Sequence, residues 1–136
     1  MSDGALNMLG LAKKAGKLEI GLDSVTACVR QGRAELILCA ADCGESARRA
    51  CRHLAQDSGA ALAELVYTKA QLGAMLGRGS PGVIALTDTG LADSLSKKLA
   101  GAYPDRYTQL SELMSRRAQK LNIGKGKRRM KNESNV

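Results

Sequence analysis

The chain has 136 residues, a formal net charge of +8 and no Phe or Trp, so its core must be built from aliphatic side chains and Met. This length suits one domain of about 100 residues with an appendage and requires no second domain. No apolar run approaches the roughly 20 residues that cross a bilayer, and the amino terminus lacks a signal-peptide pattern. We therefore expect a cytoplasmic protein that does not associate with membranes.

Helical and strand patterns alternate over the first hundred residues. Apolar spacing and capping residues predict a helix over 3–15, a short strand over 17–20, a helix from Asp23 or Ser24 to Arg30, and a buried strand over 35–41. A helix over 46–58, a strand over 63–67, a helix over 68–77, a strand over 83–86 and a helix over 90–99 follow. This order predicts an α/β fold: a three-layer α-β-α sandwich around a four-stranded mixed sheet.

The character of the chain changes beyond Gly101. Residues 1–100 contain 12 lysines and arginines against 10 acids, whereas residues 101–136 contain 9 against 3. Apolar spacing predicts an amphipathic helix over about 108–121, followed by a basic run that we expect to be disordered in isolation. Such a run has the composition of an electrostatic arm that lies along phosphates. The expected phosphate contacts are Lys125, Lys127, Arg128, Arg129 and Lys131. The sequence thus divides into a domain over 1–100 and a basic extension over 101–136.

The strand-helix-strand unit over 16–42 offers an anion site. Gly21 allows a sharp turn directly before the helix, whose first backbone N–H groups and dipole favour phosphate. Lys17, Arg30 and Arg33 are its basic residues, and we expect them to contribute to the site.

Neither a metal site nor a catalytic site is recognisable in the sequence. The cysteines fall in or beside predicted helices and strands, as reduced core residues do: Cys28, Cys39, Cys43 and Cys51. With His53, the last three lack the paired two-residue spacing of structural zinc sites. His53 is the only histidine and has no nucleophile motif nearby, and residues 77–82 lack the Gly-Lys-Ser/Thr of a phosphate loop. We therefore expect no cofactor and no enzyme activity; a small hydrolase or transferase is the weakest alternative.

Several short segments follow one another in an order known from other proteins. They are Leu-Gly-Leu-Ala-Lys-Lys-Ala-Gly-Lys at 9–17, Gly21, Gly32, Ala-Ala-Asp at 40–42, Tyr-Thr-Lys at 67–69 and Val-Ile-Ala-Leu-Thr-Asp at 83–88. Over about residues 5–95, this order resembles the kink-turn-binding ribosomal-protein superfamily of the L-seven-Ae type, and within it the bacterial YlxQ-like branch. The resemblance implies an α-β-α sandwich that binds structured RNA, often a helix-internal bend called a kink-turn, and no enzyme.

The resemblance also implies where RNA would bind. The family's RNA face consists of the amino end of the second helix and the loop before the last strand. In this sequence the matching residues are Gly21, Asp23, Ser24, Arg78, Gly79, Ser80, Gly82 and Val83, and Arg48 could add charge beside them. The implied partner is ribosomal RNA or a structured regulatory RNA, bound on or off the ribosome by a chain that is a monomer when free.

Three residues keep a second function open. Asp23, Ser24 and Ala27 stand where the family's strongest RNA binders carry Asn, Glu and Lys. Asp23 can accept hydrogen bonds from a guanine edge, but it cannot donate one, and its charge repels phosphate. The alternative is a protein-interaction module of the same fold that has lost kink-turn binding and docks a translation or assembly partner.

Overall fold

The computed structural model describes the backbone of residues 3–77 and 79–134 and the side chains of residues 3–77 and 79–121. Helices and strands alternate as the sequence predicts, and the order confirms the α/β class. The elements are α1 (Gly4–Lys14), β1 (Leu18–Ile20), α2 (Leu22–Arg30), β2 (Leu36–Cys39), α3 (Glu45–Ser58), β3 (Ala61–Glu64), α4 (Lys69–Leu76), β4 (Val83–Leu86), α5 (Thr89–Ala102) and α6 (Pro104–Ser134).

The four strands form one mixed sheet in the order β1-β4-β2-β3. β4 is antiparallel to both of its neighbours, whereas β3 is parallel to β2 and is reached through α3. The register sets Cys39, the last residue of β2, opposite Val83, the first residue of β4. The carboxyl ends of β1, β2 and β3 therefore meet the amino end of β4 at one end of the sheet, which we call the loop end.

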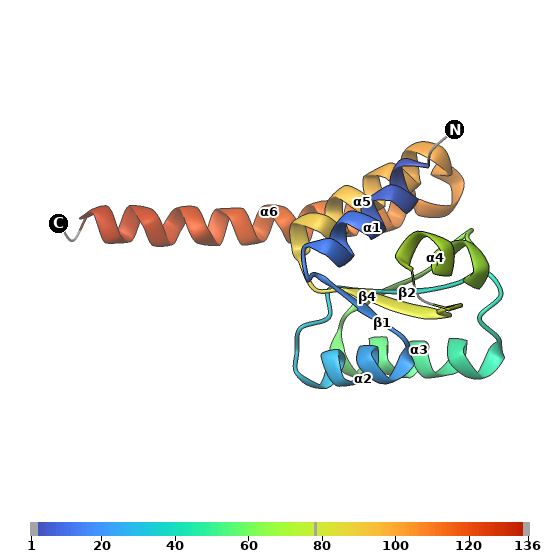
Figure 1. Cartoon of the computed structure of the whole chain (residues 1–136). Coiled ribbons are helices and arrows are strands. Elements are labelled where there is room, and N and C mark those ends of the chain that lie inside the picture. Colours follow the sequence, from blue (N-terminus) through green and yellow to red (C-terminus); the bar gives the residue numbers. More distant parts are fainter. Residues whose placement is uncertain (1–2, 78, 135–136) are drawn as a thin grey trace.

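Helices cover both faces of the sheet, so the central strands are buried on both sides. Figure 1 shows α2 and α3 below the sheet and α1, α4 and α5 above it. Leu36 and Leu38 of β2 contribute to the core on the α1 side, whereas Ile37 and Cys39 contribute to the smaller core against α2 and α3. This alternation explains why β2 and β4 read as continuous apolar runs, and it confirms the predicted three layers.

The third strand starts two residues earlier and ends three residues earlier than predicted. Val66 and Tyr67 have high strand propensity and favoured a strand over 63–67, whereas the alanines of the observed strand, Ala61–Glu64, do not. Pairing with β2 determines which residues form β3. The N–H of Leu65 makes the last hydrogen bond to β2, to the Cys39 carbonyl at 2.8 Å, after which the chain turns towards α4.

The extension begins as part of the core. α6 starts at Pro104, four residues before the predicted start, because proline suits the first position of a helix. Tyr107 is 2% exposed and Met114 is 1% exposed, both within the main core, and the Tyr107 hydroxyl donates to the Glu64 carbonyl at 2.6 Å.

The second half of α6 extends away from the sandwich (Figure 1). The disorder predicted for 125–131 concerns the run in isolation; here the backbone stays helical through Ser134, since extending an existing helix costs little. Within the part of the chain that the structure describes, no helix has both the length and the apolar character to cross a membrane.

Candidate nucleic-acid interface

Two helices begin at the loop end with the same backbone geometry. Gly21 precedes α2 with φ 96° and ψ 150°, and Gly44 precedes α3 with φ 90° and ψ 157°. Both conformations lie in a region that is essentially restricted to glycine. Neither glycine has a side chain that could cap its helix, and within the described part of the chain no side-chain cap hydrogen bond is made at either helix start. The loop end therefore presents two helix amino termini that attract anions and hydrogen-bond acceptors.

The loop before β4 is fixed against both of these helix starts. The N–H of Gly21 donates to the Val83 carbonyl at 2.8 Å, and the N–H of Ala40 donates to the Gly82 carbonyl at 2.8 Å. A Cβ placed on Gly82 would lie 3.3 Å from the Cβ of Cys43, which shows how closely the two loops approach. We call this joint region, residues 21–24, 41–44 and 79–83 with Lys69, the loop-end surface. It unites predicted site residues that lie about 60 positions apart.

Lys69 joins this surface although the sequence analysis did not select it. Its N–H donates to the Asp42 carboxylate at 2.8 Å, and its Cδ lies 3.6 Å from the position that a Cβ on Gly82 would occupy. The start of α4 therefore places a cation beside the loop before β4. Lys69 and the Ala-Ala-Asp triplet that ends at Asp42 both belong to segments that carry the family resemblance. That resemblance is the sequence feature from which their place at the site could have been predicted. Gly44 could have been predicted from a repeated pattern. As at Gly21, a glycine follows a strand and precedes a helix that has an acidic residue in its first turn.

The loop-end surface carries mixed charge. Asp23, in the first turn of α2, is exposed, and Ser24 beside it is half-buried. Gly79 and Ser80 are exposed in the loop before β4. Carboxylates accept hydrogen bonds from base edges, whereas the helix amino termini and Lys69 suit phosphate or carbonyl oxygens. The surface can thus contact both the backbone and the bases of a folded RNA.

Arg48 does not supply free charge to this surface. Its guanidinium makes two contacts of 2.9 Å with the two carboxylate oxygens of Glu64 and donates to the Ala41 carbonyl at 2.7 Å. From the sequence, this arginine was expected to add charge to the RNA face. The structure shows that Glu64 neutralises its charge, and that its contacts hold the loop between β2 and α3 in place.

Three other predicted residues lie away from the start of α2. Lys17 precedes β1, and its carbonyl accepts from Thr87 beyond the end of β4 at 3.0 Å. Arg30 is in the last turn of α2, and Arg33 lies 3.6 Å from Glu19 in an ion pair. α2 has nine residues and is about 13 Å long. Arg30 and Arg33 are therefore far from its amino end, although they are close to it in sequence. Outside the described residues lie Arg78 and the side chains of Lys125, Lys127, Arg128, Arg129 and Lys131.

Cys43 belongs to the loop-end surface, and Cys39 and Cys51 lie close to it; all three are free thiols. Burial, and after it the charge of a Cys43 thiolate, raises the pKa of Cys39 to about 12 and that of Cys51 to about 11. Among the residues that the structure describes, no group of His, Cys, Asp or Glu is arranged to hold a metal ion.

This burial gives a prediction for thiol chemistry. At pH 8 we expect iodoacetamide to alkylate Cys43 first, because it is the one cysteine that is only half-buried. Cys39 and Cys51 should react at least about 100-fold more slowly than in the unfolded chain, since each unit of raised pKa lowers the thiolate fraction about tenfold. Peptide mass spectrometry over time measures the rates. Equal alkylation of Cys43 and Cys51 in the native chain would contradict the packing.

The family follows from a comparison with known sequences. The profile described as "Ribosomal protein L7Ae/L30e/S12e/Gadd45 family" matches residues 4–96. The chain belongs to this family. The predicted superfamily is thereby confirmed, whereas the YlxQ-like branch stays a prediction. No curated protein sequence matches the chain.

Solved structures share the fold of this family member. A protein with unknown function from Bacillus halodurans C is 23% identical, with 71% of this chain and 97% of that chain covered and a TM-score of 0.65. The Giardia lamblia 15.5kD RNA binding protein is 18% identical, with 71% and 82% covered and a TM-score of 0.57. The L7Ae/L30e/S12e/Gadd45 match contains the whole loop-end surface but ends before α6.

Proposed function

We propose that this member of the L7Ae/L30e/S12e/Gadd45 family is a non-enzymatic RNA-binding protein that recognises kink-turn-like RNA, ribosomal or regulatory, through the loop-end surface. The observation that carries the proposal is the hydrogen bond from Gly21 to Val83, which holds an uncapped helix amino terminus beside an exposed loop. Membership of a ribosomal-protein family supports it. So does the structural likeness to a Giardia lamblia protein named as RNA-binding.

The chemistry of the surface suits a bent duplex. The first N–H groups of α2 and α3 would bind phosphate oxygens, and Lys69 would neutralise a further phosphate. Leu22, whose side chain is 37% exposed beside Gly21, offers apolar area to a ribose or an unstacked base. A bend brings the backbone and the base edges of one RNA within reach of a single small surface, whereas a straight duplex presents mainly its backbone.

One observation favours the alternative of a protein-interaction module. The carboxylates of Asp23 and Asp42 lie on the loop-end surface, and their negative charge repels phosphate. The Asp42 carboxylate also accepts a hydrogen bond from the backbone N–H of Lys69. A partner with exposed N–H or guanidinium groups would suit them better than RNA. Failure of every structured RNA to bind would favour this function.

The extension is proposed to act as an electrostatic arm. Its basic run follows the packed first half of α6, which runs from Glu64 at the loop end to Gly59 before the start of β3, so the run would contact RNA that extends past the opposite end of the domain. An arm that contacts three or four phosphates should contribute a slope of roughly 2 to 3.5 to the fall of log affinity with log salt.

Fluorescence anisotropy at several salt concentrations tests both parts of the proposal. The probes are a labelled RNA duplex interrupted by a kink-turn and an uninterrupted duplex of equal length. We expect the full chain to prefer the kinked RNA at least about tenfold, and the chain 1–121 to keep this preference while losing the extra salt slope. Equal affinity for the two RNAs would overturn kink-turn recognition, and equal slopes for the two chains would overturn the arm.

Asp23→Asn tests whether the start of α2 faces the bound RNA. We expect it to strengthen binding to the kinked RNA several-fold, since the amide keeps an acceptor, gains a donor and removes a charge that repels phosphate. Asp57→Asn, on the far half of α3, makes the same charge change elsewhere and should have a much smaller effect. Weaker binding by the Asp23→Asn chain would show that the carboxylate accepts two donors from the RNA.

A further inference from the structure

A second concave surface lies between α1 and α4, next to the loop-end surface. It is a groove of about 590 Å³ with walls from the carboxyl halves of both helices. Lining residues include Asn7, Gly10, Leu11, Lys14, Met75 and Gly77. We call it the α1–α4 groove. Lys69 begins α4 at the loop-end surface, and Met75 lies six residues further on, about 9 Å along the helix axis. The groove and the loop-end surface adjoin at the other end of α4, where Gly77 of the groove lies two residues before Gly79.

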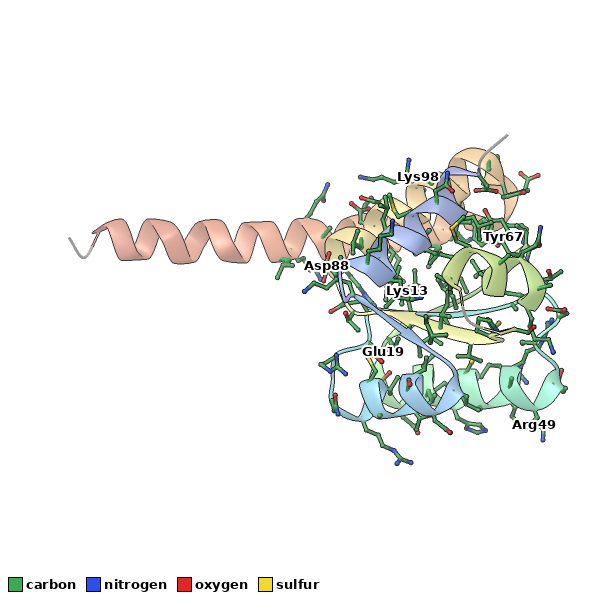
Figure 2. All side chains as sticks on the ribbon, in the orientation of Figure 1. Lys13, Glu19, Arg49, Tyr67, Asp88 and Lys98 are labelled. Carbon is green, nitrogen blue, oxygen red and sulfur yellow. The ribbon has the colours of Figure 1, made fainter. Side chains whose placement is uncertain are left out.

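The groove is a fixed feature of the fold. Gly10 has no side chain, and a Cβ there would lie 3.1 Å from the sulfur of Met75, so the two helices approach closely at this point. At the end of the groove, the Lys13 ammonium donates to the Leu76 carbonyl in the last turn of α4. Figure 2 shows Lys13 at the carboxyl end of α1, on the side of the sheet where α4 lies. These contacts fix both walls before any partner binds.

The floor and rim of the groove expose apolar atoms. Leu11 is 60% exposed, the highest value for a large apolar side chain in the part of the chain whose side chains are described. A single exposed leucine is ordinary on a protein surface. Here it stands at the rim of a concave site, next to the half-buried Met75. An apolar partner would remove both side chains from water together.

The charge of the two helices is of one sign. α1 and α4 contain Lys13, Lys14 and Lys69 and no Asp or Glu between their first and last residues. Among the residues that the structure describes, none in the lining of the groove is acidic. α3, on the other side of the sheet, carries both signs, including Glu45 paired with Arg52. The groove therefore combines apolar area with unopposed positive charge.

We propose that the α1–α4 groove docks an acidic amphipathic helix of a partner protein. A helix laid into the valley between two helices can place apolar residues at positions i, i+3, i+4 and i+7 against Leu11 and Met75, and carboxylates beside Lys14. α1 is 11 residues and about 16 Å long, so a partner helix of about three turns fills the valley. RNA fits less well, because a phosphate backbone would contact Lys14 but leave Leu11 and Met75 without apolar contact.

The test is a titration of the ¹⁵N-labelled full chain with a designed peptide. The probe is a helix-forming peptide of about 16 residues with leucines at i, i+3, i+4 and i+7 and glutamates elsewhere on the flanks. Its twin has lysine in place of every glutamate. We expect the acidic peptide to shift the amide signals of Asn7, Leu11 and Gly77, and the basic twin to shift none of them.

A matched pair of variants locates the binding. Leu11→Ser with Lys14→Glu should weaken the acidic peptide at least about tenfold. Leu121→Ser with Lys120→Glu makes the same change on the exposed side of α6 and should leave peptide affinity within about twofold. Both variants should retain the native circular dichroism spectrum and melting temperature, since the altered side chains are exposed.

Three results would overturn the proposal. The first is an acidic peptide that binds no more tightly than its basic twin. The second is a set of shifts centred on Gly21 and Gly82, because the peptide would then be acting as a polyanion at the loop-end surface. The third is a loss of kinked-RNA binding in the Leu11→Ser, Lys14→Glu chain that the α6 control does not show, which would assign the groove to RNA.

Discussion

Cutting the chain after Gly101 is expected to unfold the domain. The cut removes the buried side chains of Tyr107 and Met114, the half-buried Leu110 and Leu113 beside them, and the hydrogen bond from Tyr107 to Glu64. Removing one large buried side chain costs about 2–5 kcal/mol, and small domains are stable by about 5–15 kcal/mol in total. Losing four therefore approaches the whole stability. Thermal and urea unfolding followed by circular dichroism measures it.

The chain 1–121 is the control for this truncation. It loses the basic run but keeps every described extension side chain that packs on the core, so its melting temperature should stay close to that of the full chain. A sharper pair is Met114→Ala, expected to cost about 2–5 kcal/mol, against Leu121→Ala, expected within about 0.5 kcal/mol, since Leu121 is 45% exposed. Cooperative melting of 1–101 near the full-chain temperature would instead support the predicted domain boundary at residue 100.

Lys69→Glu is expected to weaken binding to kinked RNA by about tenfold or more. The substitution puts a negative charge beside the loop before β4, where the proposed interface holds phosphates, and charge reversal both removes an attraction and adds a repulsion. It should leave the fold unchanged, because the hydrogen bond to Asp42 comes from the backbone N–H of this residue. Anisotropy with the kinked duplex measures the effect.

Lys98→Glu makes the same change in net charge at another place. Lys98 is exposed on α5, on the outer layer of the sandwich (Figure 2), away from the loop end. We expect at most a small loss of affinity for this variant. Equal losses in both variants would mean that RNA responds only to overall charge, and the loop-end surface would lose its assigned role.

The layers of the fold could be predicted because each is encoded locally. β2 and β4 are apolar on both faces, and Asp3, Thr68 and Asp88 are helix caps that hydrogen-bond as their residue types favour. β3 could be predicted only approximately, since its alanines have weak strand propensity and its position depends on pairing with β2. The docking of α6 depends on contacts between segments far apart in sequence, which the amphipathic pattern alone left open.

The candidate site was predictable only where a resemblance supplied spatial information. It brought Gly21 and the loop before β4 together although no local pattern connects them. Charge counting without geometry said little about position: Arg30 lies in the last turn of α2 and Arg33 three residues beyond it, both away from Gly21, and Arg48 is paired with Glu64. Basic residues are common on surfaces, so their presence near a motif says little about which way they face.

The hydrogen bonds from Gly21 to Val83 and from Ala40 to Gly82 have a kinetic consequence. They set the relative positions of the helix starts and the first residues of β4 before any ligand arrives, so the protein gives up little conformational entropy at these points on binding. On the proposed function, the conformational adjustment then falls to the RNA. An RNA already bent in its free state should associate near the rate of diffusional encounter, whereas one that is mostly extended should bind at a rate set by the fraction of time it spends bent.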